Sequence, residues 1–522
     1  MISTITAKEP IMSKEKSIQY VDIDGKTYFK IENSDRLRPF FMSVVSSGNH
    51  WMFIGSNGGL SAGRKNAENA LFPYYTDDKI IESAEYTGSK TIFKVRKEET
   101  HIWEPFSFRY NKKFKISRNL YKSVYGNAVV FEEINHDLSL SFRYEWNSSA
   151  QYGFVKTSYL KNLSDLPCDL EFLDGLQNIL PKDVGSELQN RSSNLVDAYK
   201  RNELHEASGL GIYALSAMIV DKAEPREALK ANVVWSLGLK NNEYLLSSLQ
   251  LNAFRGNKKL KKETDIKGEK GAYFVKNSLQ LNGRETKTWN VIANVNQTNT
   301  DLIKLIESIE NDNSLLDKVK QDIKSGTQKL VSLNASADGL QYTSDPLNDA
   351  RHFSNVLFNI MRGGVFDFNY QIEREDFSFF VQTANKKVFN NHKEAIDALP
   401  EKFNLFELRT LSSKINDPNY KRIVTEYLPL KFSRRHGDPS RPWNKFSINT
   451  QRELDGTKVL DYQGNWRDIF QNWEALAHTF PEFIEGMIFK FLNATTFDGY
   501  NPYRVTKDGF DWETIVPNNP WA

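Results

Sequence analysis

Residues 301–326 read DLIKLIESIENDNSLLDKVKQDIKSG, and this stretch divides the chain into two parts of different character. Apolar residues recur there at helical spacing in two successive runs, namely Leu302, Ile303, Leu305, Ile306 and Ile309, and then Leu315, Leu316, Val319 and Ile323. The polar break at 311–313 offers a cap for the second run, and Gly326 offers a C-terminal stop. The stretch predicts a helical linker of two helices, which we place at residues 298–333.

The part of the chain before this linker carries strand signals. Asp24-Gly25 stands between two alternating segments, which is the strongest short signal for a β-hairpin. Short runs rich in β-branched and aromatic residues, separated by turn residues, continue to about Val295, at 90–95, 114–117, 138–144, 152–160, 170–173, 213–219 and 286–293. Many short strands with few helix signals predict a large antiparallel β-sandwich at residues 1–297.

The part after the linker has helical periodicity. Residues 465–478 place apolar side chains on one stripe (Trp466, Ile469, Phe470 and Trp473) and polar side chains on the neighbouring stripe. Residues 479–482 then read TFPE, a capping box with a proline in the first turn, and a second apolar helix follows. Two helices at a tight corner predict a helical hairpin of an incomplete (α/α)6 toroid at residues 334–522. The predicted fold class is therefore α+β multidomain.

Composition excludes several classes of function. The 522 residues include 68 basic and 66 acidic side chains, a formal net charge of +2, which gives no electrostatic case for a nucleic-acid partner. Cys168 is the only cysteine, so the chain forms no internal disulfide and no multi-thiolate metal site. The first residues lack the apolar stretch of a secretory signal, and the most apolar window, 209–220, is too short to span a bilayer. We expect a soluble cytoplasmic protein with no membrane association, no metal and no organic cofactor.

The first candidate site is the segment 462–474, YQGNWRDIFQNWE. Arg467 and Asp468 combine a planar fork of donors with a pair of acceptors, which suits the vicinal hydroxyls of a sugar. Trp466 could supply an apolar face, and Gln471 and Asn472 extend the polar stripe. The alternative is an amphipathic helix with a surface ion pair, and the spacing alone leaves both open.

Two loops provide further candidates. In residues 433–446, SRRHGDPSRPWNKF, the side chains of Arg435, His436 and Asp438 could bind phosphate or a sugar, although a solvated basic loop has the same composition. In residues 497–513, FDGYNPYRVTKDGFDWE, carboxylates lie among aromatic residues near Tyr500 and Arg504. Glycosidic chemistry uses such carboxylates, and a turn-rich loop is the competing interpretation.

Three stretches resemble the cellobiose phosphorylase type of inverting glycoside phosphorylases, glycoside hydrolase family 94. They are the glycine-rich segment 49–78 with SNGGLSAGRKNAENALFPYYTDD, the segment 152–181 with TSYLKNLSDLPCDLEFLDGLQNILP, and GNWRDIFQN at 464–472. The resemblance implies a sandwich, a helical linker and a toroid in that order. It also implies that Arg467 and Asp468 line the donor-sugar subsite. Gln471 is displaced from the family's glutamine, and Asn472 replaces a family aspartate.

The family's general acid is an aspartate in a Gly-Asp-Trp-Asn-Asp segment, and this sequence contains no such segment. We therefore expect a truncated or split chain whose general acid lies elsewhere. The resemblance implies inverting phosphorolysis of a β-linked disaccharide or oligosaccharide to a sugar 1-phosphate, with inorganic phosphate as co-substrate. The alternatives are an inverting glycoside hydrolase on the same scaffold and a non-catalytic carbohydrate-binding protein. The expected partners are a small carbohydrate and phosphate, and in addition a separate C-terminal half or a second copy of the chain.

Overall fold

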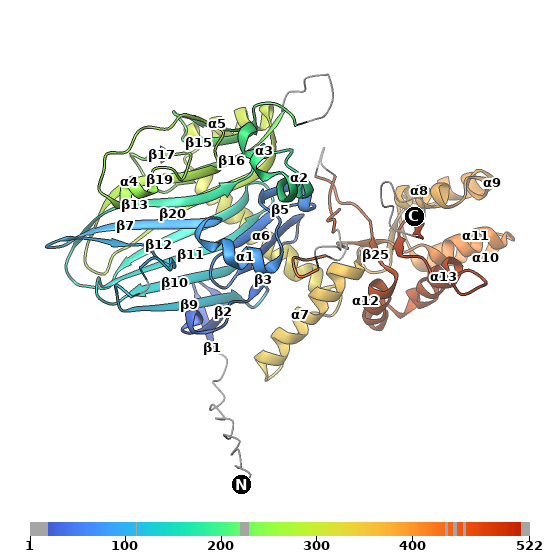
Figure 1. Ribbon diagram of the computed structural model, residues 1–522. Coiled ribbons are helices and arrows are strands. Elements are labelled where there is room, and N and C mark those ends of the chain that lie inside the picture. The colour runs from blue at the N-terminus through green and yellow to red at the C-terminus, as the bar shows by residue number, and fades with distance from the viewer. Residues whose placement is uncertain are drawn as a thin grey trace, which may run out of the picture.

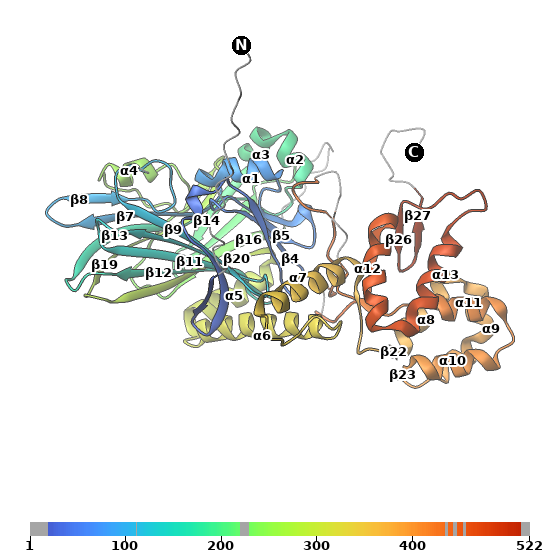
Figure 2. The same ribbon diagram turned by 90° about the horizontal axis from the view of Figure 1, so that it is seen from below.

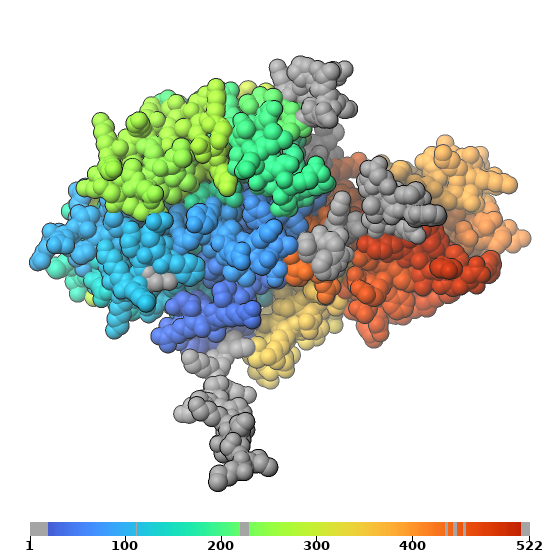
Figure 3. Space-filling model, in the orientation of Figure 1, coloured from blue at the N-terminus to red at the C-terminus, as the bar shows by residue number. Residues whose placement is uncertain are grey.

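The computed structural model describes residues 19–110, 112–219, 229–433, 437–441, 446–452 and 456–512. A β-rich part and a smaller helical part lie side by side, joined by the linker helices and α7 (Figure 1). The space-filling view shows the same division, with the β-rich part in blue and green and the helical part in orange and red (Figure 3). This arrangement agrees with the order of parts predicted from the sequence, while the predicted domain boundaries stay predictions.

The largest sheet has eleven strands, all paired antiparallel. In spatial order they are β1 (Gln19–Ile23), β2 (Lys26–Ile31), β9 (Ile116–Ser123), β10 (Val129–Asn135), β11 (Leu140–Ser149), β12 (Gly153–Asn162), β20 (Thr286–Thr298), β16 (Lys230–Leu237), β15 (Leu210–Leu215), β14 (Lys200–His205) and β18 (Asp265–Lys267). The predicted first hairpin is confirmed, because Asp24 and Gly25 both have positive φ, at 53° and 76°, between β1 and β2.

Two smaller antiparallel sheets pack on the large one. The five-stranded sheet contains β17 (Glu243–Leu245), β19 (Gly271–Leu281), β13 (Cys168–Ile179), β7 (Gly88–Arg96) and β8 (Thr100–Trp103), and the four-stranded sheet contains β3 (Phe41–Val44), β4 (His50–Gly55), β5 (Leu60–Arg64) and β6 (Ala70–Phe72). Residues of all three sheets form one buried cluster, in which Phe93 packs on Phe142 and Phe172 on Trp289. The predicted large antiparallel sheets are confirmed.

This core also encloses a charged pair. The Lys156 ammonium lies 2.5 Å from the Asp174 carboxylate, and neither side chain is exposed at all. The same carboxylate accepts hydrogen bonds from Thr91, Ser158 and Trp289, at 2.6, 3.0 and 2.7 Å. Each charge is therefore compensated, as burial requires. Short helices lie at the margins of the sheets: α1 (Asp77–Glu82), α2 (Ser186–Arg191), α3 (Ser193–Tyr199) and α4 (Leu251–Arg255).

The linker consists of α5 (Asn299–Asn311) and α6 (Leu315–Ala335), which lie along one side of the β-rich part (Figure 2). Their apolar stripes pack on the outer face of the large sheet, where Val155, Trp235 and Ile292 are buried. A capping box between Thr298 and Asp301 begins α5. The predicted stop at Gly326 is wrong, because α6 continues to Ala335 and buries Leu330 completely. Packing of the last turns overrides the local preference of glycine to end a helix.

The helical part begins with α7 (Pro346–Gly363), which Asp345 caps by accepting hydrogen bonds from the backbone of Leu347 and Asn348. The other helices are α8 (Arg374–Ala384), α9 (Lys386–Asp397), α10 (Leu405–Lys414), α11 (Pro418–Glu426), α12 (Trp466–Thr479) and α13 (Ile484–Ala494). Three small sheets connect them, formed by β21 (Val365–Phe366) with β24 (Leu430–Lys431), by β22 (Gln371–Glu373) with β23 (Lys402–Asn404), and by β25 (Gln463–Asn465), β26 (Arg504–Thr506) and β27 (Gly509–Asp511).

The toroid stays a prediction, since the described residues after the linker form seven α-helices and three small sheets rather than a closed ring. The predicted capping box at 479–482 is wrong: a 3-10 turn (Pro481–Phe483) separates α12 from α13, and no side chain caps it. The Glu482 carboxylate instead accepts a hydrogen bond from the Tyr370 hydroxyl. Within the described ranges, no helix combines the length and the apolarity that a bilayer crossing needs.

Candidate functional site

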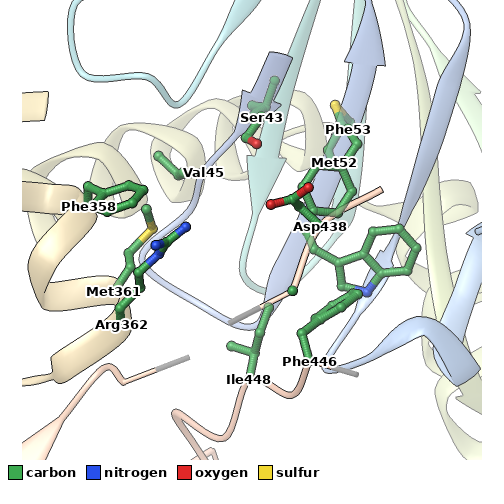
Figure 4. Close-up of a pocket in the computed structure, with 13 residues that line it drawn as sticks. Ser43, Val45, Met52, Phe53, Phe358, Met361, Arg362, Asp438, Phe446 and Ile448 are labelled. Atoms are coloured by element: carbon green, nitrogen blue, oxygen red, sulfur yellow. The ribbon is translucent and has the colours of Figure 1, made fainter. Parts of the chain in front are cut away.

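A cavity of about 160 Å³ lies where the four-stranded sheet, the C-terminal end of α7 and the loop around Asp438 meet (Figure 4). Its walls come from segments far apart in sequence: Ser43, Val44, Val45, Trp51, Met52, Phe53, Phe358, Met361, Arg362, Gly437, Asp438, Phe446 and Ile448. Most of this lining is apolar, and only a few polar groups face the space. Concave apolar sites with a few placed polar groups are typical of small-molecule binding.

The aromatic rings of Trp51, Phe53 and Phe446 form one wall of the cavity. Trp51 and Phe53 on β4 pack against Phe446 and against Tyr74 outside the lining, with ring centroids 5.5 to 6.4 Å apart and mostly edge-to-face. The indole nitrogen of Trp51 donates to the Asn66 carbonyl at 3.0 Å. These contacts hold the loop at residue 446 against the sheet. The aromatic wall is therefore supported by contacts within the chain.

Charged groups lie on both sides of the cavity, with Asp438 on the side of the aromatic rings and Arg362 across from it. Figure 4 shows the Arg362 guanidinium and the Asp438 carboxylate turned toward each other across the cavity. Burial lowers the pKa of Arg362 to about 10, and the charges of Asp468 and Asp438 oppose that shift, while Arg441 adds to it. Burial, and secondarily the Asp438 charge, also raises the pKa of the Tyr74 hydroxyl. The site thus combines carboxylates and a cation in partly desolvated surroundings.

The packing of α7 on α12 places Asp468 in this group. The amide nitrogen of Asn472 donates to the Asn359 side chain at 2.9 Å, and the indole nitrogen of Trp473 donates to the Gly363 carbonyl at 2.8 Å. A Cβ atom on Gly363 would lie 2.9 Å from the Cβ of Asn472, so only glycine permits this approach. The close crossing brings the first turn of α12, which carries Asp468, toward the end of α7.

The predicted pair of Arg467 and Asp468 forms an ion pair, with 3.7 Å from the Arg467 Nε to the Asp468 Oδ1, but the two side chains differ in exposure. The Arg467 side chain is 85% exposed, whereas the Asp468 side chain is only 19% exposed. Trp466 is half-buried and packs edge-on against Phe491 at 4.7 Å. Gln471 is exposed and Asn472 is buried in the helix contact. Asp468 is the member of this motif that lies near the cavity, because its charge affects the pKa of the cavity residue Arg362.

The two candidate loops differ in where their predicted site residues lie relative to the cavity. Asp438 lines the cavity, and its carboxylate accepts a hydrogen bond from the Ser440 backbone at 2.9 Å. Arg435 and His436 lie outside the described residues. Tyr500 is exposed, and Arg504 pairs with Asp511 across β26 and β27, so both residues lie away from the cavity lining. Arg504 has a structural contact in the small sheet.

Sequence reasoning missed Arg362 and the residues that the sandwich contributes, chiefly Ser43 and Phe53. The available signal for Arg362 was a cation in the last turn of α7, directly before two glycines. No signal marked Ser43 or Phe53, because a strand end becomes a cavity wall only through packing against another domain. The described residues contain no cluster of three or more His, Cys, Asp or Glu that could hold a metal.

One family model matches a part of the chain: residues 366–429 match the model of glycoside hydrolase family 149 insertion domain 1. The segment is closed at its base by the antiparallel pairs Val365 with Lys431 and Phe366 with Leu430. Helices α8 to α11, which the sequence assigned to the toroid, lie in this matched segment. The match covers only this segment, so it does not assign the whole chain to a family.

Among solved structures, the chain is similar to a bacterial glucoamylase complexed with acarbose, at 8% identity and a TM-score of 0.34, over 77% of this chain and 54% of that one. It is also similar to a protein from the human microbiome described as a kojibiose phosphorylase, at 9% identity and a TM-score of 0.29, over 90% of this chain and 50% of that one. The chain thus spans about half the length of each. Likenesses of this strength define neither fold nor function, and no curated protein matches the sequence.

Proposed function

We propose that the chain belongs to a glycoside phosphorylase-like enzyme that cleaves a β-linked disaccharide or oligosaccharide with inorganic phosphate. The observation that carries this proposal is the match of 366–429 to an insertion domain of a glycoside hydrolase family. That insertion follows α7 directly, and α7 supplies Phe358, Met361 and Arg362 to the cavity. The candidate sugar site therefore adjoins the matched module.

The chemistry of the cavity supports a sugar ligand. A pyranose ring has apolar faces and a polar rim, which correspond to the aromatic wall and to the charged groups on the two sides of the cavity. Carboxylates such as Asp438 accept hydrogen bonds from hydroxyl groups, and a guanidinium donates to hydroxyl oxygens. The positive charges of Arg362 and Arg441 balance the negative charges of Asp438 and Asp468. Such a balance suits a neutral ligand.

The proposed reaction inverts the anomeric centre. A phosphate oxygen bonds to the anomeric carbon as the bond to the glycosidic oxygen breaks, and a protein carboxylic acid gives its proton to that leaving oxygen. The products are a sugar 1-phosphate and the shortened saccharide. Because phosphate replaces the activated water of a hydrolase, one protein acid is sufficient and neither a metal nor an organic cofactor takes part. The proposal assigns that acid to a further segment or a separate chain.

Hydrolysis is the second candidate. Two carboxylates, Asp438 and Asp468, lie close enough to Arg362 to affect its pKa, and an inverting hydrolase needs an acid and a base. The reaction with water would then require no phosphate. A protein that binds the saccharide without turning it over is the remaining possibility, since the acid segment of the resembling family is absent from the sequence.

Phosphate dependence decides between these functions. The natural protein, with any adjacent reading frame co-expressed, is incubated with β-linked glucose disaccharides and oligosaccharides with and without inorganic phosphate. Formation of sugar 1-phosphate only in phosphate supports the proposal, and equal release of free sugar in both supports hydrolysis. Asp438→Asn should abolish sugar binding, whereas the same change at the exposed Asp397 of α9 is the matched control. Saccharide binding without turnover would indicate a non-catalytic carbohydrate-binding protein.

A further inference from the structure

Arg362 is a half-buried cation whose guanidinium has no polar partner among the described residues. Its guanidinium stacks on the Phe358 ring, with 3.7 Å from the guanidinium carbon to the ring centroid. Within the described part of the chain, the guanidinium forms no hydrogen bond and no ion pair, although Asp438 and Asp468 both influence it. Stacking on Phe358, one turn earlier on α7, fixes the plane of the fork. Five N–H donors are therefore held in place and left unused.

Such an arrangement is unfavourable for the folded chain. Removing a cation from water without compensating hydrogen bonds costs free energy, and burial accordingly lowers the pKa of this group to about 10. A purely structural arginine would reach one of the neighbouring carboxylates. The last turn of a helix does favour cations, but an exposed side chain would meet that preference without losing hydration.

The surroundings of the guanidinium indicate what could use its donors. Val45 and Met361 lie beside the guanidinium, and Asp438 faces it across the cavity from the side of the aromatic rings. A ligand there meets donors on one side, and acceptors with a ring surface on the other. A neutral sugar with adjacent hydroxyl groups offers all three matching features. An anion such as phosphate would approach the Asp438 carboxylate unfavourably.

We propose that Arg362 is a specificity-determining residue of the cavity, donating to adjacent hydroxyl oxygens of a neutral sugar while Phe358 holds its fork in the binding orientation. This inference rests on the proposed function and deepens it. It assigns recognition to the end of α7 rather than to Arg467, whose side chain is 85% exposed. The residue binds the substrate and transfers no proton.

The test uses the full chain with cellobiose, glucuronic acid and inorganic phosphate as probes, measured by calorimetry and by ligand-observed NMR. Arg362→Met removes the donors at similar length, and Arg362→Lys keeps the charge but loses the planar fork. The matched control is Arg351→Met, on the exposed side of the same helix. Phe358→Leu removes the stacking ring. Each variant is also unfolded thermally.

Cellobiose affinity should fall at least about tenfold in Arg362→Met, the loss expected for charge-assisted hydrogen bonds, and less in Arg362→Lys and Phe358→Leu. Arg351→Met should bind as the unchanged chain does. The midpoint of thermal unfolding in Arg362→Met should stay equal or rise, because an uncompensated cation is removed. A lower midpoint with full affinity would make Arg362 a structural residue and overturn the inference.

Three other outcomes distinguish the inference about Arg362 from the proposed function. If the unchanged chain binds cellobiose and Arg362→Met binds it equally, the inference about Arg362 is wrong while the proposed function stands. If phosphate or glucuronic acid binds and loses affinity in Arg362→Met, the residue selects anions and the neutral-sugar assignment is wrong. If no saccharide binds to the unchanged chain, the proposed function itself fails.

Discussion

Lys490 on α13 offers a test of the helical part that does not depend on function. Its side chain is only 3% exposed, and its ammonium donates to the Lys507 carbonyl at 3.1 Å. The rings of Phe380, Tyr462 and Phe510 lie 5.4 to 5.7 Å from it. No carboxylate of the described residues forms an ion pair with it. The charge is held by ring faces and one carbonyl, which compensate for lost hydration incompletely.

Burial lowers the pKa of Lys490 from 10.5 to about 8, against the opposing charges of Glu426 and Asp508. At about 1.4 kcal/mol for each pKa unit, the folded chain loses about 3 kcal/mol by keeping this proton at neutral pH. Between pH 8 and 10.5 the unfolded chain binds more protons than the folded one, so this contribution to the free energy of unfolding rises with pH. About 2–3 kcal/mol of it should be recovered between pH 7 and pH 10.

The assay compares Lys490→Met with the unchanged chain by urea unfolding at several pH values from 7 to 10. The variant lacks the titrating group, so the stability of the unchanged chain relative to the variant should increase by about 2–3 kcal/mol over this range. Taking the difference cancels the other groups that titrate there. Lys387→Met, on the exposed face of α9, should show no such trend. A pH-independent difference for Lys490→Met would refute the reasoning.

Three further substitutions test the packing and the caps. Asp174→Asn leaves the buried Lys156 ammonium without its counter-charge and should destabilise the β-rich part by about 3–5 kcal/mol, seen as a lower urea midpoint. Gly363→Ala places a Cβ atom 2.9 Å from the Cβ of Asn472, so it should cost about 1–3 kcal/mol in thermal unfolding and also weaken saccharide binding. Thr298→Ala removes the capping box of α5 and should cost about 1 kcal/mol, read as faster amide hydrogen exchange in that helix alone.

Local periodicity predicted the elements well where packing agrees with it. The Asp24-Gly25 hairpin and both linker helices follow directly from alternation and helical spacing, and so do the strands β7, β9, β11, β12, β13, β15 and β20. Prediction failed where distant contacts decide, as at Gly326, which α6 passes because Leu330 is buried behind it. The helical pattern of 366–429 does not by itself distinguish a toroid from the insertion domain whose model this segment matches, so the toroid stays a prediction.

The candidate site shows the same limit at the level of single residues. Arg467 and Asp468 are adjacent in sequence, yet neighbouring positions on a helix point about 100° apart, so one side chain faces water and the other approaches α7. Of the two residues that were predicted to act as a pair, only Asp468 thus lies near the site. Asp438 was found in a loop rich in charged residues, but its partners across the cavity could not be inferred from that loop.

Contacts at the ends of segment 366–429 explain how Arg362 and Asp438 can line one cavity although this segment separates them in sequence. The antiparallel pair of β21 and β24 joins the two ends of the segment, and the Ser433 hydroxyl then donates to the Arg362 carbonyl at 3.1 Å. Gly364, with φ at 87°, ends α7 and turns the chain into β21. Since both ends of the segment meet at one place, the residues before and after it lie close together. The position of the cavity residues Arg362 and Asp438 therefore depends on this pairing of β21 with β24.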